Sequence, residues 1–296
     1  MGSDSVFGEP FYGEELKIKK VEKMKIYVLG SKGMLGRYVY TYFVNNGWNT
    51  IGITRDTFDA SNVYKETFFR TFEDVSEGDV IINCMGTIKP MVDKYGTLNA
   101  IRVNSLFPHF LSEFCEYKGI NMIHITTDCV FSGKKGLYTE NDPHDCTDVY
   151  GKTKSLGEPK MCTVMRTSII GEEVGQGRSL IEWIKSMKDK TANGFTNHNW
   201  NGITCLQVAK VFMNIIENKK YWWGVVHVFS PNIVNKYELV KTVSDVYGLN
   251  ITLNAMEDKN PIDRTMASIY EPRFEIPSIE QQIMEMKEYH SNLIRI

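Results

Sequence analysis

Apolar and polar positions alternate in blocks along the chain, and each block has the period of a strand or of a helix. Short apolar runs rich in β-branched residues occur at residues 25–29, 49–54, 79–86 and 121–128. Between them, residues 34–47 and 97–119 carry apolar side chains at helical spacing, and each of these two stretches ends in a glycine. Alternation of strands and helices predicts a parallel sheet covered on both faces.

The same alternation continues through the second half of the chain. Further strands are expected over residues 162–170 and 224–230, and further helices over residues 178–189, 204–218 and 235–248. We therefore predict an α/β fold: a Rossmann-type, doubly wound parallel sheet over residues 24–165, with a smaller substrate-binding α/β lobe over residues 166–296. Some elements of the two parts are expected to interleave. Residues 1–23 show no sustained period and are interpreted as an N-terminal extension.

Composition narrows the class of protein. The 296 residues are 42% hydrophobic and 24% charged, which is ordinary for a globular chain with a sizeable core. A formal net charge of −2 gives no reason to expect a nucleic acid partner. No run approaches about 18 consecutive apolar residues, and no secretory layout opens the chain, so we expect no membrane span and a cytoplasmic location. The six cysteines form no Cys-x-x-Cys pair, so we expect free thiols and no metal site.

A glycine-rich turn follows the first predicted strand. The stretch "LGSKGMLG" places Gly30, Gly33 and Gly36 where that strand gives way to the first helix. Such a turn allows the backbone to approach a pyrophosphate, and the helix N-terminus offers unpaired N–H groups to it. A tight turn with glycines for packing alone is the structural alternative.

The residues about 20 positions further on bear on which dinucleotide is bound. Arg55 could clamp a 2′-phosphate with help from Lys32, whereas Asp56 would repel a phosphate and suit a free ribose hydroxyl. Because two cations outnumber one adjacent carboxylate, we predict NADPH as the cofactor and leave NADH as the alternative.

The stretch "YGKTKSLGE" places a phenol and an ammonium one helical turn apart, at Tyr150 and Lys154. A nearby ammonium favours phenolate and is expected to lower the tyrosine pKa, as a general acid/base for hydroxyl–carbonyl chemistry requires. Thr126 and Thr127 end the preceding predicted strand, where open parallel sheets place their ligands. One of these hydroxyls is expected to face the crevice and polarise a substrate carbonyl.

Six segments occur together in an order that is typical of one family: "VLGSKGMLGR", "VIINCMGTIKP", "RVNSLFPHFLSEFC", "HITTDCVFSGKKGLYTEND", "VYGKTKSLGE" and "MRTSII". From Met24 to about Tyr247 the chain resembles the extended short-chain dehydrogenase/reductase superfamily and, within it, the dTDP-4-dehydrorhamnose reductase family. The resemblance implies that Thr127, Tyr150 and Lys154 are the catalytic residues, with Lys154 also holding the nicotinamide ribose. It further implies a cofactor-binding set of Gly30, Lys32, Gly33, Met34, Leu35, Gly36, Arg55, Asp59, Cys84, Met85, Gly86, Asn104, Tyr150 and Lys154.

The resemblance also implies a reaction. NADPH would deliver a hydride to the C4 ketone of a nucleotide-linked 4-keto-6-deoxysugar, with Tyr150 donating the proton and Thr127 orienting the oxygen. The implied partner is this nucleotide sugar, and a homodimer is common in the superfamily. An alternative to an enzyme is a regulatory subunit that keeps the fold and the cofactor pocket but does not turn over a substrate.

One position departs from the family pattern. Cys129 stands where an aromatic residue is usual, and a cysteine there acts as an acid/base in related bifunctional 3,5-epimerase/4-reductases, including the UDP-rhamnose type. A second acid/base residue would then be needed, for which Lys89 and His198 are candidates by residue type. The alternative for Cys129 is a small apolar residue that only packs.

The substrate's diphosphate and base need their own contacts. An arginine suits bidentate phosphate binding and a tryptophan can stack on a base or a sugar. The predicted substrate-binding residues are Lys89, Arg166 and Trp200, and Arg178 is a further phosphate candidate. Arg166 could instead be the partner in a structural ion pair.

Overall fold

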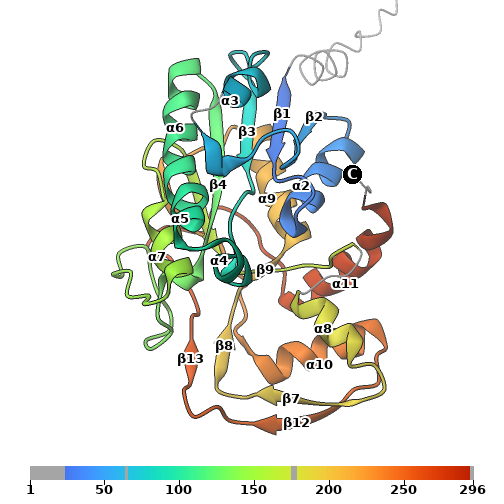
Figure 1. Cartoon of the computed structure of the whole chain (residues 1–296). Coiled ribbons are helices and arrows are strands. Elements are labelled where there is room, and N and C mark those ends of the chain that lie inside the picture. The colour runs from blue at the N-terminus through green and yellow to red at the C-terminus, as the bar shows by residue number, and fades with distance from the viewer. Residues whose placement is uncertain (1–23, 64–65, 175–178, 294–296) are drawn as a thin grey trace, which may run out of the picture.

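The computed structural model describes residues 24–63, 66–174 and 179–293. The N-terminal extension 1–23 and the phosphate candidate Arg178 lie outside these ranges. A six-stranded parallel sheet forms the main body (Figure 1), in the order β2–β1–β3–β4–β5–β10. Its strands are β1 (Lys25–Leu29), β2 (Asn49–Ile53), β3 (Val80–Asn83), β4 (Asn121–Thr127), β5 (Thr163–Thr167) and β10 (Gly224–His227). The predicted doubly wound α/β fold is therefore confirmed.

Both faces of this sheet are buried, as its nearly continuous apolar strands require. Along β1, Ile26 and Val28 point into one apolar cluster, whereas Tyr27 and Leu29 point into another on the opposite face. Helices α2 and α9 cover the first face, and α3 and α6 cover the second. The bounds of these helices are α2 (Met34–Asn45), α3 (Glu66–Thr71), α6 (Phe107–Lys118) and α9 (Cys205–Glu217).

The single helix predicted over residues 97–119 is divided into three parts. A short α5 (Thr97–Ala100) leads into the π-helical turn η2 (Ile101–Leu106), and α6 follows it. Gly119 ends α6 in the left-handed conformation, with φ of 66°. A π-helical turn widens the backbone ladder and is frequent at functional sites. Here it carries the predicted cofactor residue Asn104.

Elements from the C-terminal half lie both in the main body and in a separate lobe (Figure 1). Strand β10 pairs with β5 at the sheet edge, and α9 packs against α2. The lobe holds three small sheets, β7–β12, β11–β8–β13 and β6–β9, beside three helices. Its elements are β6 (Ile169–Ile170), α8 (Leu180–Ser186), β7 (Thr191–Phe195), β8 (His198–Trp200), β9 (Ile203–Thr204), β11 (Val234–Asn235), α10 (Lys236–Tyr247), β12 (Thr252–Met256), β13 (Ile262–Asp263) and α11 (Ile279–Tyr289).

Several short elements surround the carboxyl ends of the main strands. They are η1 (Ala60–Asn62), α4 (Lys89–Tyr95), η3 (Asp128–Val130) and α7 (Val149–Leu156), and a last turn, η4 (His290–Asn292), follows α11. The strand order reverses between β1 and β3, because the chain runs outward from β1 to β2 in one direction and from β3 to β4 in the other. Open α/β sheets bind their ligands at such a switch point.

Candidate functional site

A cavity of about 290 Å³ lies at the carboxyl ends of β1 and β3, at this switch point. Many of the residues that the sequence predicts for the cofactor line it: Gly30, Lys32, Gly33, Arg55, Asp59, Cys84, Met85 and Gly86. The fold thus brings the glycine turn after β1 together with the segment after β3, although these segments are about fifty residues apart in the sequence.

The glycine turn has a geometry that larger residues would disrupt. Gly30 has φ of +78°, and its carbonyl accepts a 2.8 Å hydrogen bond from the Gly33 N–H. A Cβ on Gly36 would lie 2.1 Å from the Gly30 oxygen. Helix α2 then begins at Met34 without a side-chain cap, and Leu35 packs into the core. The first N–H groups of α2 are therefore available to an anion such as a pyrophosphate.

Two cations at the cavity rim are each paired with a carboxylate. Lys32 Nζ lies 3.0 Å from Asp56 Oδ2, and Arg55 Nη2 lies 3.3 Å from Asp59 Oδ2. The Arg55 guanidinium also stacks over Tyr95, 5.0 Å from the ring centroid. Ion pairs this exposed contribute little to stability. Both cations can therefore turn to a bound phosphate at small cost.

Helix α7 carries the phenol and the ammonium. Asp148 caps its N-terminus, because Asp148 Oδ1 accepts a 2.9 Å hydrogen bond from the Gly151 N–H. Tyr150 follows in the first turn. Lys154, which is 5% exposed, donates from Nζ to the Ile125 carbonyl at 2.9 Å. The lysine thus anchors α7 to the middle of β4.

Thr127, rather than Thr126, is the strand-end hydroxyl on the Tyr150 side. Its Oγ1 donates to Asp128 Oδ1 at 3.1 Å, accepts from the Cys129 N–H at 3.2 Å and contacts the Tyr150 phenol. The Thr126 hydroxyl is buried without a hydrogen-bond partner among the described residues. Of the two hydroxyls that the sequence left open, Thr127 is the one beside the phenol.

The electrostatics of Tyr150 differ from the sequence expectation. Burial, followed by the neighbouring Cys129, raises the pKa of the Tyr150 phenol, and the contact with Thr127 opposes this rise. The expected lowering of the phenol pKa is wrong for this arrangement. A protonated phenol is nevertheless the form that can donate a proton.

Asn104 connects the cofactor cavity to α7. Its Oδ1 accepts from the Thr87 N–H at 2.7 Å, and its Nδ2 donates to the Thr87 carbonyl at 2.9 Å and to Thr153 Oγ1 at 3.1 Å. Thr87 lines the cavity. Both ends of the Asn104 amide therefore fix the position of the cavity wall relative to the Tyr150 helix.

A protein-family comparison decides the affiliation of the chain. The family described as RmlD substrate binding domain matches residues 24–273. The chain belongs to this RmlD family. Methionine adenosyltransferase 2 subunit beta of Danio rerio is 27% identical over 243 residues, which cover 76% of this chain and 74% of that protein.

Two reductases are also similar to this RmlD-family chain. The dTDP-4-dehydrorhamnose reductase of Mycolicibacterium smegmatis is 29% identical over 140 residues, covering 47% of this chain and 41% of that protein. The solved dTDP-4-dehydrorhamnose reductase of Bacillus anthracis in complex with NADP has a TM-score of 0.77 at 14% identity, covering 90% of this chain and 99% of that one. At this identity the structural likeness shows the shared fold.

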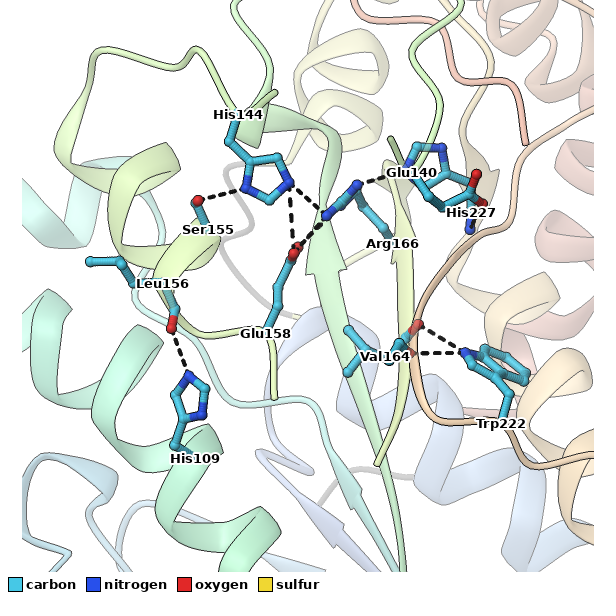
Figure 2. Close-up of polar contacts among 11 residues, drawn as sticks. His109, Glu140, His144, Ser155, Leu156, Glu158, Val164, Arg166, Trp222 and His227 are labelled. Atoms are coloured by element: carbon cyan, nitrogen blue, oxygen red, sulfur yellow. Dashed lines mark hydrogen bonds and ion pairs between the residues drawn. The ribbon is translucent and has the colours of Figure 1, made fainter. Parts of the chain in front are cut away.

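Within this RmlD-family chain, Arg166 does not reach a substrate. The side chain is 2% exposed, and all three guanidinium nitrogens contact neighbouring groups (Figure 2). Nε and Nη2 donate to Glu158 at 3.1 and 2.6 Å, Nη1 lies 2.8 Å from His227 Nε2, and Nη2 lies 2.7 Å from His144 Nε2. The prediction of substrate binding is wrong for Arg166, which is a structural ion-pair residue.

Trp200 is likewise misassigned. It lies in β8 rather than in the predicted loop, is 5% exposed and belongs to the apolar core. Its ring faces the Lys236 ammonium, 5.5 Å from the centroid. A buried ring in this position has no free face for a base. The predicted stacking role is therefore wrong.

The remaining acid/base candidates lie in different surroundings. Lys89 is half exposed and pairs with Asp148 Oδ2 at 3.1 Å, so its predicted contact with substrate stays a prediction. The His198 ring packs at a tilt against Phe195, with ring centroids 4.6 Å apart, and its Nε2 lies 3.7 Å from Asp258 Oδ2. These contacts of His198 are with residues of the lobe, and Cys129 is not among them.

The sequence patterns did not reveal two cations near the carboxyl end of β4. Lys236, at the start of α10, and Arg264, after β13, both interact electrostatically with Asp128 and Cys129. Arg264 is fixed by hydrogen bonds from Nε to the Phe131 carbonyl at 2.9 Å and from Nη2 to the Ser132 carbonyl at 3.3 Å. No local motif marks either cation, because the lobe brings them to this place from more than a hundred residues away.

The thiol of Cys129 lies beside Asp128. Burial and the adjacent Asp128 raise the pKa of its thiol to about 12. The group is therefore protonated near neutral pH.

Neither a metal-binding cluster nor a membrane-spanning helix occurs among the described residues. No cluster of three or more His, Cys, Asp or Glu side chains suited to a metal ion occurs within residues 24–63, 66–174 and 179–293. In the same ranges, no helix has both the length and the apolar character to cross a membrane.

Proposed function

We propose that the protein catalyses the NADPH-dependent reduction of the C4 ketone of a nucleotide-linked 4-keto-6-deoxysugar. The convergence of Thr127, Tyr150 and Lys154 at the carboxyl end of β4, beside the glycine-turn cavity, carries this proposal. Membership of the RmlD family and the likeness to dTDP-4-dehydrorhamnose reductases support it.

Each of the three side chains has a role in this reaction. Bound NADPH supplies the hydride. The Thr127 hydroxyl holds the ketone oxygen close to the Tyr150 phenol, and the phenol donates the proton as negative charge develops on that oxygen. Lys154 would stabilise the resulting phenolate by its charge and would help to hold the ribose of the bound cofactor. Gly36 supports a dinucleotide as the ligand, because a Cβ at this position would lie 2.1 Å from the Gly30 oxygen and prevent the close strand-to-helix turn that dinucleotide sites use.

The choice of NADPH over NADH rests on the cavity rim. Lys32 and Arg55 both line the cavity and stand close to where the adenosine ribose would lie. A 2′-phosphate would replace their weak surface pairs with Asp56 and Asp59 by charge-assisted hydrogen bonds. We expect Arg55→Ala to weaken NADPH binding at least tenfold and NADH binding less than threefold, as measured by fluorescence titration.

The direct test is NADPH oxidation, followed at 340 nm, with 4-keto-6-deoxyglucose carried on dTDP and on UDP, each with and without an added 3,5-epimerase. Oxidation that depends on the epimerase would establish a plain 4-reductase. Oxidation without it would make Cys129 a catalytic acid, and Cys129→Ser would then lose the epimerase-independent rate alone. A protein that binds NADPH but oxidises none with any of these substrates would contradict the proposal.

A regulatory role is the second candidate, and one observation favours it. The relative with the longer match, methionine adenosyltransferase 2 subunit beta, is by name a subunit of a different enzyme. In that case the cofactor would stabilise the fold without turnover. Co-purification with, and altered kinetics of, a methionine adenosyltransferase catalytic subunit would support this role, and unchanged kinetics at saturating protein would remove it.

A further inference from the structure

His144 lies in the segment that connects the carboxyl end of β4 to helix α7, and its ring contacts both α7 and β5 (Figure 2). Its Nδ1 lies 2.6 Å from Ser155 Oγ on α7, and its Nε2 lies 2.7 Å from Arg166 Nη2 on β5. A guanidinium nitrogen can only donate a hydrogen bond, so Nε2 of His144 must accept one. The neutral ring therefore carries its hydrogen on Nδ1 and donates it to the Ser155 oxygen.

The second histidine beside Arg166 obeys the same rule. His227 Nε2 lies 2.8 Å from Arg166 Nη1, and His227 Nδ1 lies 2.7 Å from the Ala267 carbonyl oxygen. A carbonyl oxygen can only accept, so Nδ1 of this ring carries the hydrogen and Nε2 accepts from the arginine. Two histidine rings thus accept hydrogen bonds from one permanent cation, and only a neutral ring can do so.

Three charged groups act on His144 from the elements around it. Arg166 faces the ring from β5, Glu158 Oε2 lies 3.8 Å away just after α7, and Asp145 is the next residue in the chain. Both carboxylates have other partners. Glu158 accepts from Arg166 at 3.1 and 2.6 Å, and Asp145 accepts from Ser132 at 2.6 Å. Burial, together with the Arg166 charge, lowers the pKa of His144 against these two carboxylates, so the ring is neutral at pH 7.5.

The segment that follows His144 leads directly into the proposed reductase site. The Cys146 N–H donates to the Val130 carbonyl at 3.2 Å, just beyond the end of β4. Two residues later Asp148 caps α7, and Tyr150 lies in the first turn of that helix. The contacts of His144 therefore help to set where this segment, and with it the Tyr150 turn, lies relative to β5.

We propose that His144 is a proton-controlled positioning residue for the Tyr150 helix: the neutral ring connects α7 to Arg166 on β5, and protonation breaks this connection. A proton on Nε2 would place two donors 2.7 Å apart, so the charged ring must turn away from the arginine. Acid should then loosen the segment between His144 and α7 reversibly. The meaning of this switch for catalysis rests on the proposed function.

Nitrogen NMR of the histidine rings tests the tautomer in the free wild-type protein, without turnover. At pH 7.5 a long-range ¹H–¹⁵N spectrum should show His144 as a neutral ring with its hydrogen on Nδ1, and lowering the pH should charge it with a midpoint below about 6.5. The ring is assigned through its own Cβ and backbone resonances, so no variant is needed. A His144 ring with its hydrogen on Nε2, or one already charged at pH 7.5, would overturn the inference.

Hydrogen exchange, followed by mass spectrometry, measures the structural consequence. After correction for intrinsic rates, the protection of amides 145–151 should fall about three- to tenfold between pH 7.5 and 5.5, because the released ring binds a proton near pH 6.5. His144→Gln keeps an acceptor for Arg166 and a donor for Ser155 but does not titrate. Its protection should therefore fall by no more than about twofold over the same range. An equal fall in the wild type and in His144→Gln would refute the switch.

His109→Gln is the matched control, since it alters an exposed histidine of α6 that contacts the Leu156 carbonyl at the other end of α7. This variant should show the same fall in protection as the wild type. In an active enzyme, His144→Gln should keep a larger share of its kcat at pH 5.5 than the wild type does. A protein with the predicted tautomer and exchange that reduces no ketosugar would refute the proposed function alone. An active enzyme whose His144 carries its hydrogen on Nε2 would refute this inference alone.

Discussion

At the residue scale, two elements, β4 and α7, hold the three proposed reacting groups. Thr127 ends β4, Tyr150 sits in the capped first turn of α7, and Lys154 is tied to the Ile125 carbonyl. Because burial raises the phenol pKa, Tyr150 is protonated in the free protein and ready to donate. The sequence was enough to predict these three residue types and their order. It was not enough to predict the direction of the Tyr150 pKa shift, because that direction depends on burial, which the spacing of residues does not reveal.

Replacing the Tyr150 phenol tests its role as the proton donor. Tyr150→Phe should lower kcat by about 10²- to 10⁴-fold, the usual contribution of general acid–base catalysis, while the Kd for NADPH stays within about twofold. Stopped-flow oxidation and fluorescence titration measure the two quantities. Tyr117→Phe removes a phenol that is 86% exposed and serves as the matched control. A Tyr150→Phe variant with more than a tenth of the wild-type kcat would rule out this role.

At the element scale, two short structural devices set the site: the cap of α7 and the glycine turn before α2. Period and glycine placement were enough to predict the strands and the long helices of the main sheet. They were not enough to predict the π-helical turn η2, because its extra residue leaves the apolar spacing of residues 97–119 almost unchanged. The strand β8 was also missed, since it is three residues long and pairs only within the lobe.

The helix cap gives the first prediction at this scale. Asp148→Ala removes the acceptor for the Gly151 N–H and should lower the free energy of unfolding by about 1 kcal/mol in urea titrations. Asp148→Asn keeps an acceptor oxygen and should recover most of that loss. Equal stability of the alanine variant and the wild type would show that the cap is not needed.

The glycine turn before α2 gives the second prediction at this scale. In Gly36→Ala the added methyl would meet the Gly30 carbonyl oxygen at 2.1 Å, so α2 must shift away from the turn. We expect a fall in Tm of several degrees and at least a tenfold loss of NADPH affinity. Gly86→Ala is the control, since its methyl would lie 3.6 Å from the nearest atom, Asn104 Oδ1, and its Tm should stay near that of the wild type. Similar Tm values for the two variants would refute the steric account.

At the scale of the whole molecule, a polar network joins the main sheet to the lobe. The Arg166 guanidinium on β5 contacts the His227 ring on β10 (Figure 2). The backbone N–H of His227 donates to Glu140 Oε1 at 2.8 Å. Glu140 also accepts from Ser268 Oγ at 2.7 Å and from the Ile269 N–H at 2.9 Å. The sequence could not assign Arg166 to this network, because the partners come from four separate segments. An arginine after a strand has the same local pattern whether it binds a phosphate or a buried glutamate.

This network makes stability depend on pH. Burial, followed by the Arg166 charge, lowers the pKa of His227 to about 4, whereas a histidine in the unfolded chain titrates near 6.5. Between these values the unfolded chain binds more protons, so the free energy of unfolding falls as pH drops from about 6.5 toward 4. Thermal melts at pH 5.0, 5.75 and 6.5 should show this slope. His227→Gln should reduce it and leave the part that comes from His124 and His144, whose pKa values burial also lowers. A Tm that is constant or rises toward pH 5 would contradict the account.

The most direct test of the central claim follows the hydride itself. The protein is incubated with NADPH deuterated at the nicotinamide C4 position and with the dTDP-linked and UDP-linked ketosugars, and the nucleotide sugars are then analysed by mass spectrometry. The account predicts one deuterium in the reduced product, bound at sugar C4, and labelling that is at least about a hundredfold slower with Tyr150→Phe. Bound NADPH with no label in any sugar would show that the Thr127, Tyr150 and Lys154 site does not reduce these substrates.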